Sequence, residues 1–233
     1  LTSYQRGWWE DFYRHSFAEF AVVNQLSASA ITVTVECDCP APTATSLTAD
    51  PPAAGPRAED ISGSPRRVLC PLGGGKDSLV TRLLLQERGI DSTWFYCGDG
   101  EGEFGASDRL RGIVDVSGDE GLVMPQVFNN AAFAAVKSRG LTPCGYPWAA
   151  AVALNATIAA IAYDFDTIVV GNERSANYGN GMRVGGVEVN HQFDKSFEFE
   201  KRLHEYIRRH ISPTVYYFSA LQDLWETQIA FKF

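Results

Sequence analysis

The sequence predicts an α/β fold in which a mainly parallel sheet carries helices on both faces. From residue 66 onward, short apolar runs typical of buried strands alternate with longer runs that have the spacing of amphipathic helices. Three glycines stand between the first strand-like run and the first helix-like run, where sheets of this class bind ligands. The chain has 233 residues, 45% of them hydrophobic, which is enough for one large core.

The order of elements follows from these patterns and from the turn residues between them. We expect strands at 66–71, 92–97, 112–116, 166–171 and 214–218. We expect helices at 77–89, 126–139, 147–163 and 197–210, and a last helix from Ser219. An acidic, glycine-rich loop runs through Phe104, and "NGMRVGGVE" at 180–188 predicts a hairpin.

The N-terminal part is expected to form an appendage to this sheet. Aromatic residues recur at roughly helical spacing across 4–26, which indicates a helix with its aromatic stripe in the core. "AITVTVEC" at 30–37 alternates as a strand does. We therefore divide the chain into a helix and strand segment at 1–40, a linker or exposed loop at 41–65, and a main domain at 66–233. Leu1 and the apolar ending "WETQIAFKF" suggest a piece of a longer polypeptide, truncated at the C-terminus.

Composition and charge argue against several classes of function. A formal net charge of -8 and a pI near 5.0 disfavour a broad nucleic-acid-binding face. Five cysteines form no CxxC pair and no Cys/His series, so neither a zinc site nor a disulfide scaffold is expected. The apolar run at 145–163 is rich in alanine and contains Asn155, which favours a buried helix over a membrane span. No signal peptide precedes the predicted fold, so we expect a cytoplasmic protein without a membrane partner.

The stretch "LGGGKDS" at 72–78 joins the first predicted strand to the first predicted helix. Free backbone N–H groups and the positive end of the helix dipole face one point in such a loop, which makes an anion site. Asp77 stands where a Walker A loop needs Ser or Thr, and the dinucleotide fingerprint Gly-x-Gly-x-x-Gly is absent. The alternative is a tight turn whose helix is capped by Asp77. The residues predicted to bind phosphate are Gly73, Gly74, Gly75, Lys76, Asp77 and Ser78.

A second group of polar residues lies beyond the fourth predicted strand. Glu173 and Arg174 come directly after that strand, and His191, Asp194 and Lys195 precede the next helix. Arg174 and Lys195 would stabilise anionic charge, unless they are surface cations. His191 would transfer a proton near neutral pH, unless it is a histidine with a structural hydrogen bond. Glu173 and Asp194 would hold magnesium or act as a base, with helix capping as the alternative for Asp194.

The glycine loop resembles that of the PP-loop ATP pyrophosphatases, whose usual form is Ser-Gly-Gly-x-Asp-Ser. Gly74, Gly75, Asp77 and Ser78 match this form, while Gly73 replaces the first serine and so lacks its hydroxyl. With "VGNERSAN" at 170–177 and "VNHQFDKSFEFE" at 189–200, the chain resembles the MurL-type epimerase family. This family acts on the terminal glutamate of UDP-N-acetylmuramoyl-L-alanyl-L-glutamate.

The resemblance implies a PP-loop fold of the adenine nucleotide alpha hydrolase type, with ATP and Mg²⁺ as cofactors. It also implies that the glutamate carboxylate is adenylated, with release of pyrophosphate. Adenylation cancels the carboxylate charge, so a base can remove the alpha proton and an acid can return one to the opposite face. Water then releases the D-glutamyl product and AMP. The partner is a UDP-linked muramoyl dipeptide, in peptidoglycan precursor synthesis.

Within this chemistry, the residues singled out above take expected roles. His191 is the first candidate for proton transfer, with Asp194 and Glu173 behind it. Arg174 and Lys195 would neutralise charge as the bond between the alpha and beta phosphates breaks. All five are therefore candidate catalytic residues, and the glycine loop is the nucleotide site.

Three further expectations remain open from the sequence. Cys144 would be the second base of a two-base epimerase, unless it is a small buried residue. The segments 172–177 and 190–195 are expected to converge on the glycine loop, because one strand-end face must hold both nucleotide and substrate. The rival functions are a PP-loop enzyme that adenylates another substrate such as tRNA, and a non-catalytic nucleotide-binding module.

Overall fold

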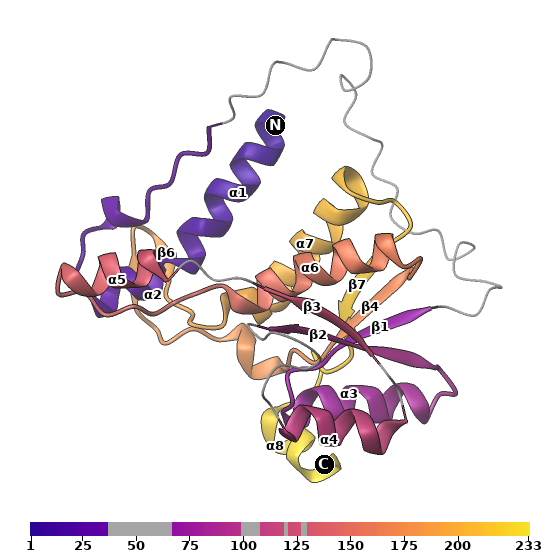
Figure 1. Cartoon of the computed structure of the whole chain (residues 1–233). Helices are drawn as coiled ribbons and strands as arrows, with labels where there is room; N and C mark the ends of the chain where they lie inside the picture. Colours follow the sequence, from indigo (N-terminus) through magenta and orange to yellow (C-terminus); the bar gives the residue numbers. More distant parts are fainter. Residues whose placement is uncertain (37–66, 99–107, 119–120, 127–129) are drawn as a thin grey trace, which may run out of the picture.

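A five-stranded parallel sheet forms the centre of the molecule, in the strand order β3-β2-β1-β4-β7 (Figure 1). The computed structural model describes residues 1–36, 67–98, 108–118, 121–126 and 130–233. The strands are β1 (Val68–Pro71), β2 (Ser92–Gly98), β3 (Leu122–Pro125), β4 (Thr167–Val170) and β7 (Tyr216–Ser219). The predicted fold class, a mainly parallel sheet with helices on both faces, is confirmed.

The strand order reverses next to β1. From β1 the chain continues through β2 to β3 on one side, and β4 and β7 are added on the other side. In open α/β sheets, ligands bind beyond the carboxyl ends of the strands at such a switch point. The loops that follow β1 and β4 therefore flank the crevice where a ligand is expected.

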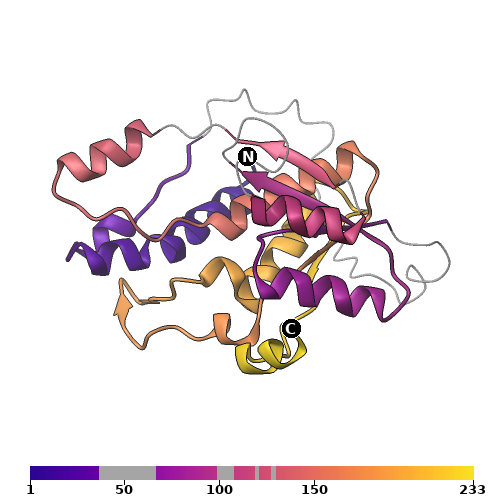
Figure 2. The same cartoon turned by 60° about the horizontal axis from the view of Figure 1, so that its bottom comes forward.

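Helices cover both faces of the sheet (Figure 1). Figure 2 brings forward the face covered by α3 (Lys76–Gln86), α4 (Asp108–Ser117) and α8 (Glu226–Lys232). The opposite face is covered by α6 (Trp148–Ala162) and α7 (Phe197–His210). Each face has its own apolar core, as the doubly wound architecture requires.

Helix α6 lies directly against the sheet because its inner face is built of alanine. Ala153, Ala156 and Ala160 are at most 1% exposed, and these small side chains let the helix axis approach the strands. Its outer face exposes Ile158 and Ile161. Across the described residues, no helix combines the length and the apolar content that crossing a membrane would need.

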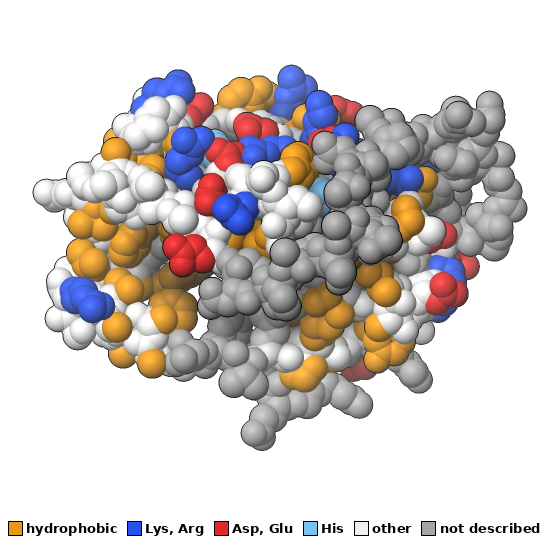
Figure 3. Space-filling view, turned by 90° about the horizontal axis from the view of Figure 1, so that it is seen from above, with side chains coloured by type: hydrophobic (Ala, Val, Ile, Leu, Met, Phe, Trp, Pro, Cys, Tyr) orange, Lys and Arg blue, Asp and Glu red, His pale blue; other side chains and the backbone are white. Residues whose placement is uncertain are grey.

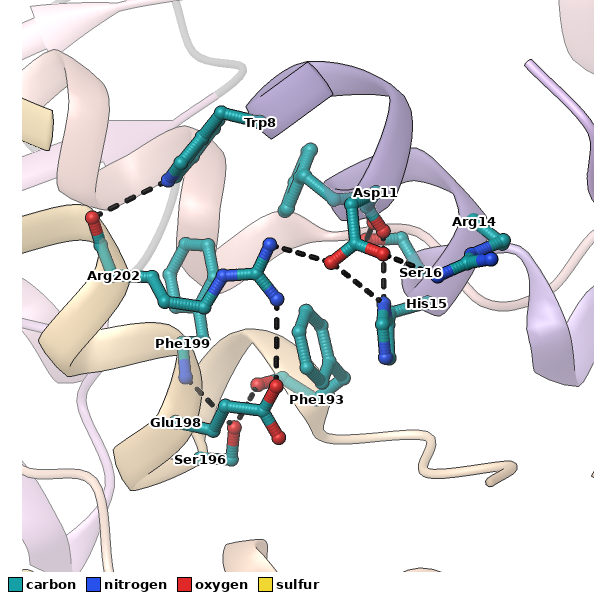
Figure 4. A network of polar contacts seen from close by, with 11 residues as sticks. Trp8, Asp11, Arg14, His15, Ser16, Phe193, Ser196, Glu198, Phe199 and Arg202 are labelled. Atoms are coloured by element: carbon teal, nitrogen blue, oxygen red, sulfur yellow. Dashed lines mark hydrogen bonds and ion pairs between the residues drawn. The ribbon is translucent and has the colours of Figure 1, made fainter. Parts of the chain in front are cut away.

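The N-terminal helix α1 (Ser3–Ser16) packs onto α7 and shares the main core. Trp8 and Phe12 are buried against Phe199 of α7, so the prediction of an aromatic core stripe is confirmed. A polar network reinforces this contact (Figure 4). Arg202 Nη2 lies 2.5 Å from Asp11 Oδ2 and, although burial opposes it, holds the pKa of Asp11 below its ordinary value. The three-part domain division itself stays a prediction, and the linker at 41–65 lies outside the described residues.

A second, outlying layer lies beyond the carboxyl edge of the sheet, beside the N-terminal segment. It contains α2 (Ala18–Val23), α5 (Ala131–Ser138) and a two-stranded hairpin of β5 (Arg183–Val184) and β6 (Val187–Glu188). The hairpin predicted at 180–188 is confirmed. The side chain of Asn24, just after α2, donates to the backbone oxygen of Thr142 at 3.0 Å, which ties two distant segments of this layer together.

Three predicted elements are wrong. Residues 28–31 form a 3-10 helix, η1 (Ala28–Ile31), and 32–36 have no regular structure, so the predicted strand at 30–37 does not form within the described residues. Residues 112–116 lie in helix α4, because Leu110 and Val114 are buried at helical spacing, and the strand comes later as β3. The last helix begins at Glu226 rather than Ser219. The predicted loop through Phe104 lies mostly outside the described residues.

Charged side chains of both signs lie interleaved on the face seen from above (Figure 3). No broad basic field is visible among the described residues on this face. The prediction against a nucleic-acid partner stays a prediction.

Candidate active site

The glycine loop connects β1 to α3 at the carboxyl edge of the sheet, as predicted. Gly74 has a φ of +73°, and Gly75 is the N-cap residue of α3. A Cβ built on Gly73 or Gly75 would meet nothing within 4 Å. Within the described residues, no hydrogen bond engages the backbone N–H groups of these three glycines. The loop therefore presents open backbone at a helix N-terminus, which is the geometry that binds anions.

Glycine at position 74 is required for two independent reasons. The positive φ is a conformation that other L residues adopt at a cost. In addition, a Cβ at this position would lie 2.6 Å from Leu110 Cδ2 and 3.1 Å from Arg109 Nη2. Helix α4 thus closes over the loop from the side of β2.

The first two residues of α3 form a charged cluster with the start of α8. Lys76 Nζ lies 3.0 Å from Asp77 Oδ1 and 3.2 Å from Glu226 Oε1. Although partial burial opposes it, these two carboxylates hold the pKa of Lys76 above its ordinary value. We call Lys76, Asp77, Glu173 and Glu226 the loop cluster.

Glu173 joins this cluster from the end of β4. Burial raises its pKa above the ordinary value, and repulsion by Glu226 and Asp77 raises it further. Its Oε2 atom is buried and has no hydrogen-bond partner among the described residues. A carboxylate held in this way is suited to accept a proton or to meet an incoming cation.

Close backbone packing brings the two strand ends together. A Cβ on Gly171, at the end of β4, would lie 2.8 Å from the backbone oxygen of Asp77 and 2.8 Å from Thr81 Oγ1. The Ser78 hydroxyl donates to the Gly75 backbone oxygen at 3.0 Å, so in this structure it supports the first turn of α3. The 172–177 loop therefore lies beside the glycine loop, as expected.

Arg174 turns toward the segment before α8. Its guanidinium carbon lies 5.2 Å from the centre of the Trp225 ring, within cation–π range. Trp225 also stacks on Tyr178 at 5.5 Å with an angle of 12° between the rings. The Arg174 backbone N–H donates to the Leu224 oxygen at 2.9 Å. The polar loop after β4 and the segment leading into α8 thus form one wall of the site.

The 190–196 segment, which we call the cap segment, has a different environment. Asp194 is 7% exposed, and its Oδ2 accepts the backbone N–H of Ala150 at 3.1 Å in the first turn of α6. Burial raises the pKa of Asp194, although the N–H groups of Ala150 and Ala149 oppose the rise. Asp194 therefore caps α6, a helix 44 residues away in the chain. Capping was the predicted alternative for this residue, though of a different helix.

His191 and Lys195 flank this buried carboxylate. His191 is exposed and borders a small depression together with Gly145 and Asp194. Lys195 is half-buried, and its backbone oxygen accepts from Gln222 Nε2 at 3.2 Å. In the part of the chain that the structure describes, no hydrogen bond or ion pair joins His191, Asp194 or Lys195 to the glycine loop.

The cap segment forms hydrogen bonds with the 172–177 loop rather than with the glycine loop. Asn190 Nδ2 donates to the Ala176 backbone oxygen at 2.8 Å, and Asn177 Oδ1 accepts the Phe197 N–H at 2.6 Å. The three segments predicted to converge therefore contact one another in sequence. The 172–177 loop lies beside the glycine loop, and the cap segment contacts the 172–177 loop.

Cys144 directly precedes Gly145, which borders the same depression as His191. Burial and the nearby Glu19 carboxylate raise the pKa of the Cys144 thiol.

The sequence reasoning did not identify Glu226, Trp225 or Arg109 as site residues. Glu226 contacts Lys76 across 150 residues, and Arg109 lies in helix α4, part of which was predicted as a strand at 112–116. No local motif marks either residue. The position of Trp225 directly before Glu226 is likewise visible only in the fold.

The site offers few carboxylates to the Mg²⁺ that the family resemblance implies. Among the described residues, no group of three or more His, Cys, Asp or Glu side chains could hold a metal ion. Mg²⁺ usually takes one or two protein carboxylates and completes its shell with water and substrate phosphates. The unpaired Glu173 oxygen and the neighbouring Asp77 suit that mode of binding, in which phosphate oxygens supply the remaining ligands.

Comparison with protein families gives a clear match. Residues 1–220 match the family model described as the MurL N-terminal domain. The chain belongs to the MurL N-terminal domain family. The resemblance inferred from the three sequence motifs is thereby confirmed, and this one MurL domain includes the N-terminal helix α1 as well as the sheet.

The relatives of this MurL domain described below share the same protein name. A protein of Xanthomonas oryzae pv. oryzae, 30% identical over 96% of this chain, is named UDP-N-acetyl-alpha-D-muramoyl-L-alanyl-L-glutamate epimerase. A Micromonospora protein of the same name is 29% identical over 94% of this chain. The chain spans 44% of the length of each of these relatives.

Two solved structures align with part of this chain at low similarity. A predicted subunit of a tRNA methyltransferase from Methanocaldococcus jannaschii aligns over 71% of this chain and 73% of its own, with 14% identity and a TM-score of 0.44. The U34-tRNA thiolase NcsA from Methanococcus maripaludis aligns over 74% of this chain and 58% of its own, with 17% identity and a TM-score of 0.40.

Proposed function

We propose that this chain is the ATP-binding and substrate-activating part of an epimerase that converts the terminal L-glutamate of UDP-MurNAc-L-Ala-L-Glu to D-glutamate. The names of its relatives support the substrate and the reaction. The observation that carries the proposal is the open glycine loop at the switch point of the sheet, with the loop cluster around it.

Epimerisation at this carbon needs activation because its carboxylate is already negative. Removing the alpha proton would place a second negative charge beside the first. In the proposed reaction, a carboxylate oxygen attacks the alpha phosphorus of ATP, the alpha–beta phosphate bond breaks, and pyrophosphate leaves. The acyl group then carries no charge and can accept the electron pair that the departing proton leaves behind.

The proton steps and the release follow from the same intermediate. A base takes the alpha proton, an acid returns one to the opposite face, and water attacks the acyl carbon so that AMP leaves. Positioned acid–base groups contribute about 10²- to 10⁴-fold, so activation has to supply much of the remaining rate increase.

The residues divide between these two tasks. The N–H groups from Gly73 to Gly75 would hold phosphate oxygens. Lys76 and Arg174 would neutralise negative charge on the phosphates. Asp77 and Glu173 would hold Mg²⁺, which lowers the charge on the phosphates when bound. Since the loop cluster has three carboxylates and one lysine, a divalent cation would also offset its repulsion of a triphosphate.

The proton-transfer side would lie at the depression bordered by His191 and Gly145. His191 is exposed and free to meet a substrate carbon there. Because the pKa of the Cys144 thiol is raised, this residue would be protonated at neutral pH and suited to return a proton rather than remove one. Lys195 would stabilise anionic charge on the substrate between the glycine loop and the depression that His191 borders.

A nucleotide-product assay tests the proposal. The complete protein that contains this chain is incubated with Mg-ATP and either UDP-MurNAc-L-Ala-L-Glu or bulk tRNA. We expect AMP and pyrophosphate only with the muramoyl dipeptide. Formation of ADP and phosphate would indicate a kinase or ATPase, turnover with tRNA would indicate the rival PP-loop chemistry, and nucleotide binding without any product would indicate a non-catalytic module.

A further inference from the structure

We propose that Arg109 of α4 is a phosphate-binding residue of the glycine loop, with the beta and gamma phosphates of ATP as its ligands. This inference rests on the proposed function, because it assumes that the loop binds a nucleotide. It adds a residue that lies outside the three sequence motifs, and that approaches the loop at Gly74, whereas Glu226 contacts Lys76.

The position of Arg109 follows from packing. Its neighbour Leu110 is 4% exposed and belongs to the same apolar cluster as Leu72, the residue directly before the glycines. This anchors the first turn of α4 against the loop. The Arg109 guanidinium then lies over Gly74, with Nη2 and Cζ at 3.1 and 3.3 Å from the place where a Cβ would stand. The absence of a side chain at Gly74 is what makes room for it.

The charges around the loop give Arg109 its role. Lys76, the cation within the loop, already contacts the carboxylates of Asp77 and Glu226. Arg174 lies against the Trp225 ring. Arg109 is exposed, and no carboxylate among the described residues pairs with it. Its planar guanidinium can donate two parallel hydrogen bonds to phosphate oxygens, which a lysine cannot do.

Arg111 provides a matched control on the same helix. It is also an exposed arginine, but Arg111 Nη2 pairs with Asp108 Oδ1 at 2.5 Å, and no contact joins it to the loop within the described residues. Arg109→Gln, Arg109→Lys and Arg111→Gln therefore separate a local phosphate contact from a general loss of positive charge.

The experiment measures binding of Mg-ATP, pyrophosphate, AMP and adenosine to the 233-residue chain by calorimetry. We expect Arg109→Gln to raise the Kd for Mg-ATP and pyrophosphate about tenfold or more, and the Kd for AMP and adenosine by less than about twofold. Arg109→Lys should fall between Arg109→Gln and the original chain, because it keeps the charge and loses the paired geometry. Arg111→Gln should match the original chain.

Different failures point to different errors. If the original chain binds neither Mg-ATP nor pyrophosphate, the nucleotide site itself is wrong. If it binds both and Arg109→Gln binds them equally well, Arg109 has no phosphate role. An equal loss for adenosine and pyrophosphate, or a loss shared by Arg111→Gln, would mean a structural or non-specific effect and would also overturn the assignment. Thermal unfolding of each variant identifies any loss of fold.

Discussion

The loop cluster and the cap segment are both dense in polar residues, yet their polar groups are used in opposite ways. In the loop cluster, the Lys76 ammonium contacts the carboxylates of both Asp77 and Glu226, beside open backbone. In the cap segment, the Asp194 carboxylate is buried and accepts a backbone N–H of α6. Polar density at a strand end therefore does not distinguish a candidate ligand site from a helix cap. The groups that each side chain contacts make that distinction.

The comparison is tested most strongly at Asp77. Asp77→Ala should lower pyrophosphate formation by about 10³-fold, because a positioned charged group at the phosphates is lost. The chain should stay folded, since the Asp77 side chain is 37% exposed and its ion pair joins it only to the adjacent Lys76. Asp91→Ala is the control, because Asp91 is an exposed aspartate in the turn before β2, at the opposite edge of the sheet. Normal turnover by Asp77→Ala would remove the loop cluster from the mechanism.

His191 tests whether the region of the cap segment also takes part in chemistry. His191→Ala should still form pyrophosphate, but exchange of the substrate alpha proton in heavy water should fall by about 10²-fold. Mass spectrometry of the glutamyl product measures this exchange. Exchange at the normal rate would withdraw the proton-transfer role, and a loss of pyrophosphate formation would mean that His191 serves activation instead.

The capping role of Asp194 is tested by measuring the stability of a variant that lacks its carboxylate. Asp194→Ala should lower the free energy of unfolding by about 2 kcal/mol, because N–H groups in the first turn of α6 lose their buried acceptor. Urea denaturation measures the loss, with the exposed Asp115 of α4 changed to Ala as the control. A variant of unchanged stability that forms no pyrophosphate would mean that Asp194 acts in catalysis and not as a cap.

The pH dependence of Glu200 gives the smallest expected effect. Glu200 is 6% exposed and accepts from Gln222 Nε2 at 2.9 Å, and burial raises its pKa above 4.5. A raised carboxyl pKa means that the folded chain holds the proton more tightly than the unfolded chain. The stability from this group is therefore present below pH 4.5 and is lost as the pH rises through the folded pKa.

Glu200→Gln removes this titration. Relative to the variant, the original chain should lose unfolding free energy as the pH rises above 4.5, because its buried carboxyl group must then ionise. Chemical denaturation at several pH values measures the difference between the two chains. A difference that stays constant with pH would show that Glu200 titrates normally.

Sequence patterns predicted the sheet and the glycine loop because both are encoded locally. The apolar runs of β1, β2, β4 and β7 and the three glycines each span only a few adjacent residues. β3 was missed because it has four residues, none of them fully buried, so its pattern is weak. The strand predicted at 112–116 failed because a short apolar run fits a helix equally well.

The contacts that define the site could not be predicted in the same way. The pairing of Lys76 with Glu226 joins residues 150 positions apart, and the bond from Ala150 to Asp194 joins residues 44 positions apart. Such pairs follow from how helices pack on the sheet, which no motif records. The approach of Arg109 to Gly74 likewise depends on the burial of Leu110.

The central claim, that ATP activates the substrate carboxylate, has a direct isotopic test. UDP-MurNAc-L-Ala-L-Glu, with its glutamate alpha-carboxylate labelled with ¹⁸O, is incubated with Mg-ATP and the complete protein that contains this chain. In the proposed reaction the carboxylate oxygen bonds to the alpha phosphorus, and water later breaks the bond between that oxygen and the acyl carbon. We therefore expect one carboxylate oxygen in the AMP phosphate for each turnover. AMP that carries oxygen only from ATP and solvent water would contradict it.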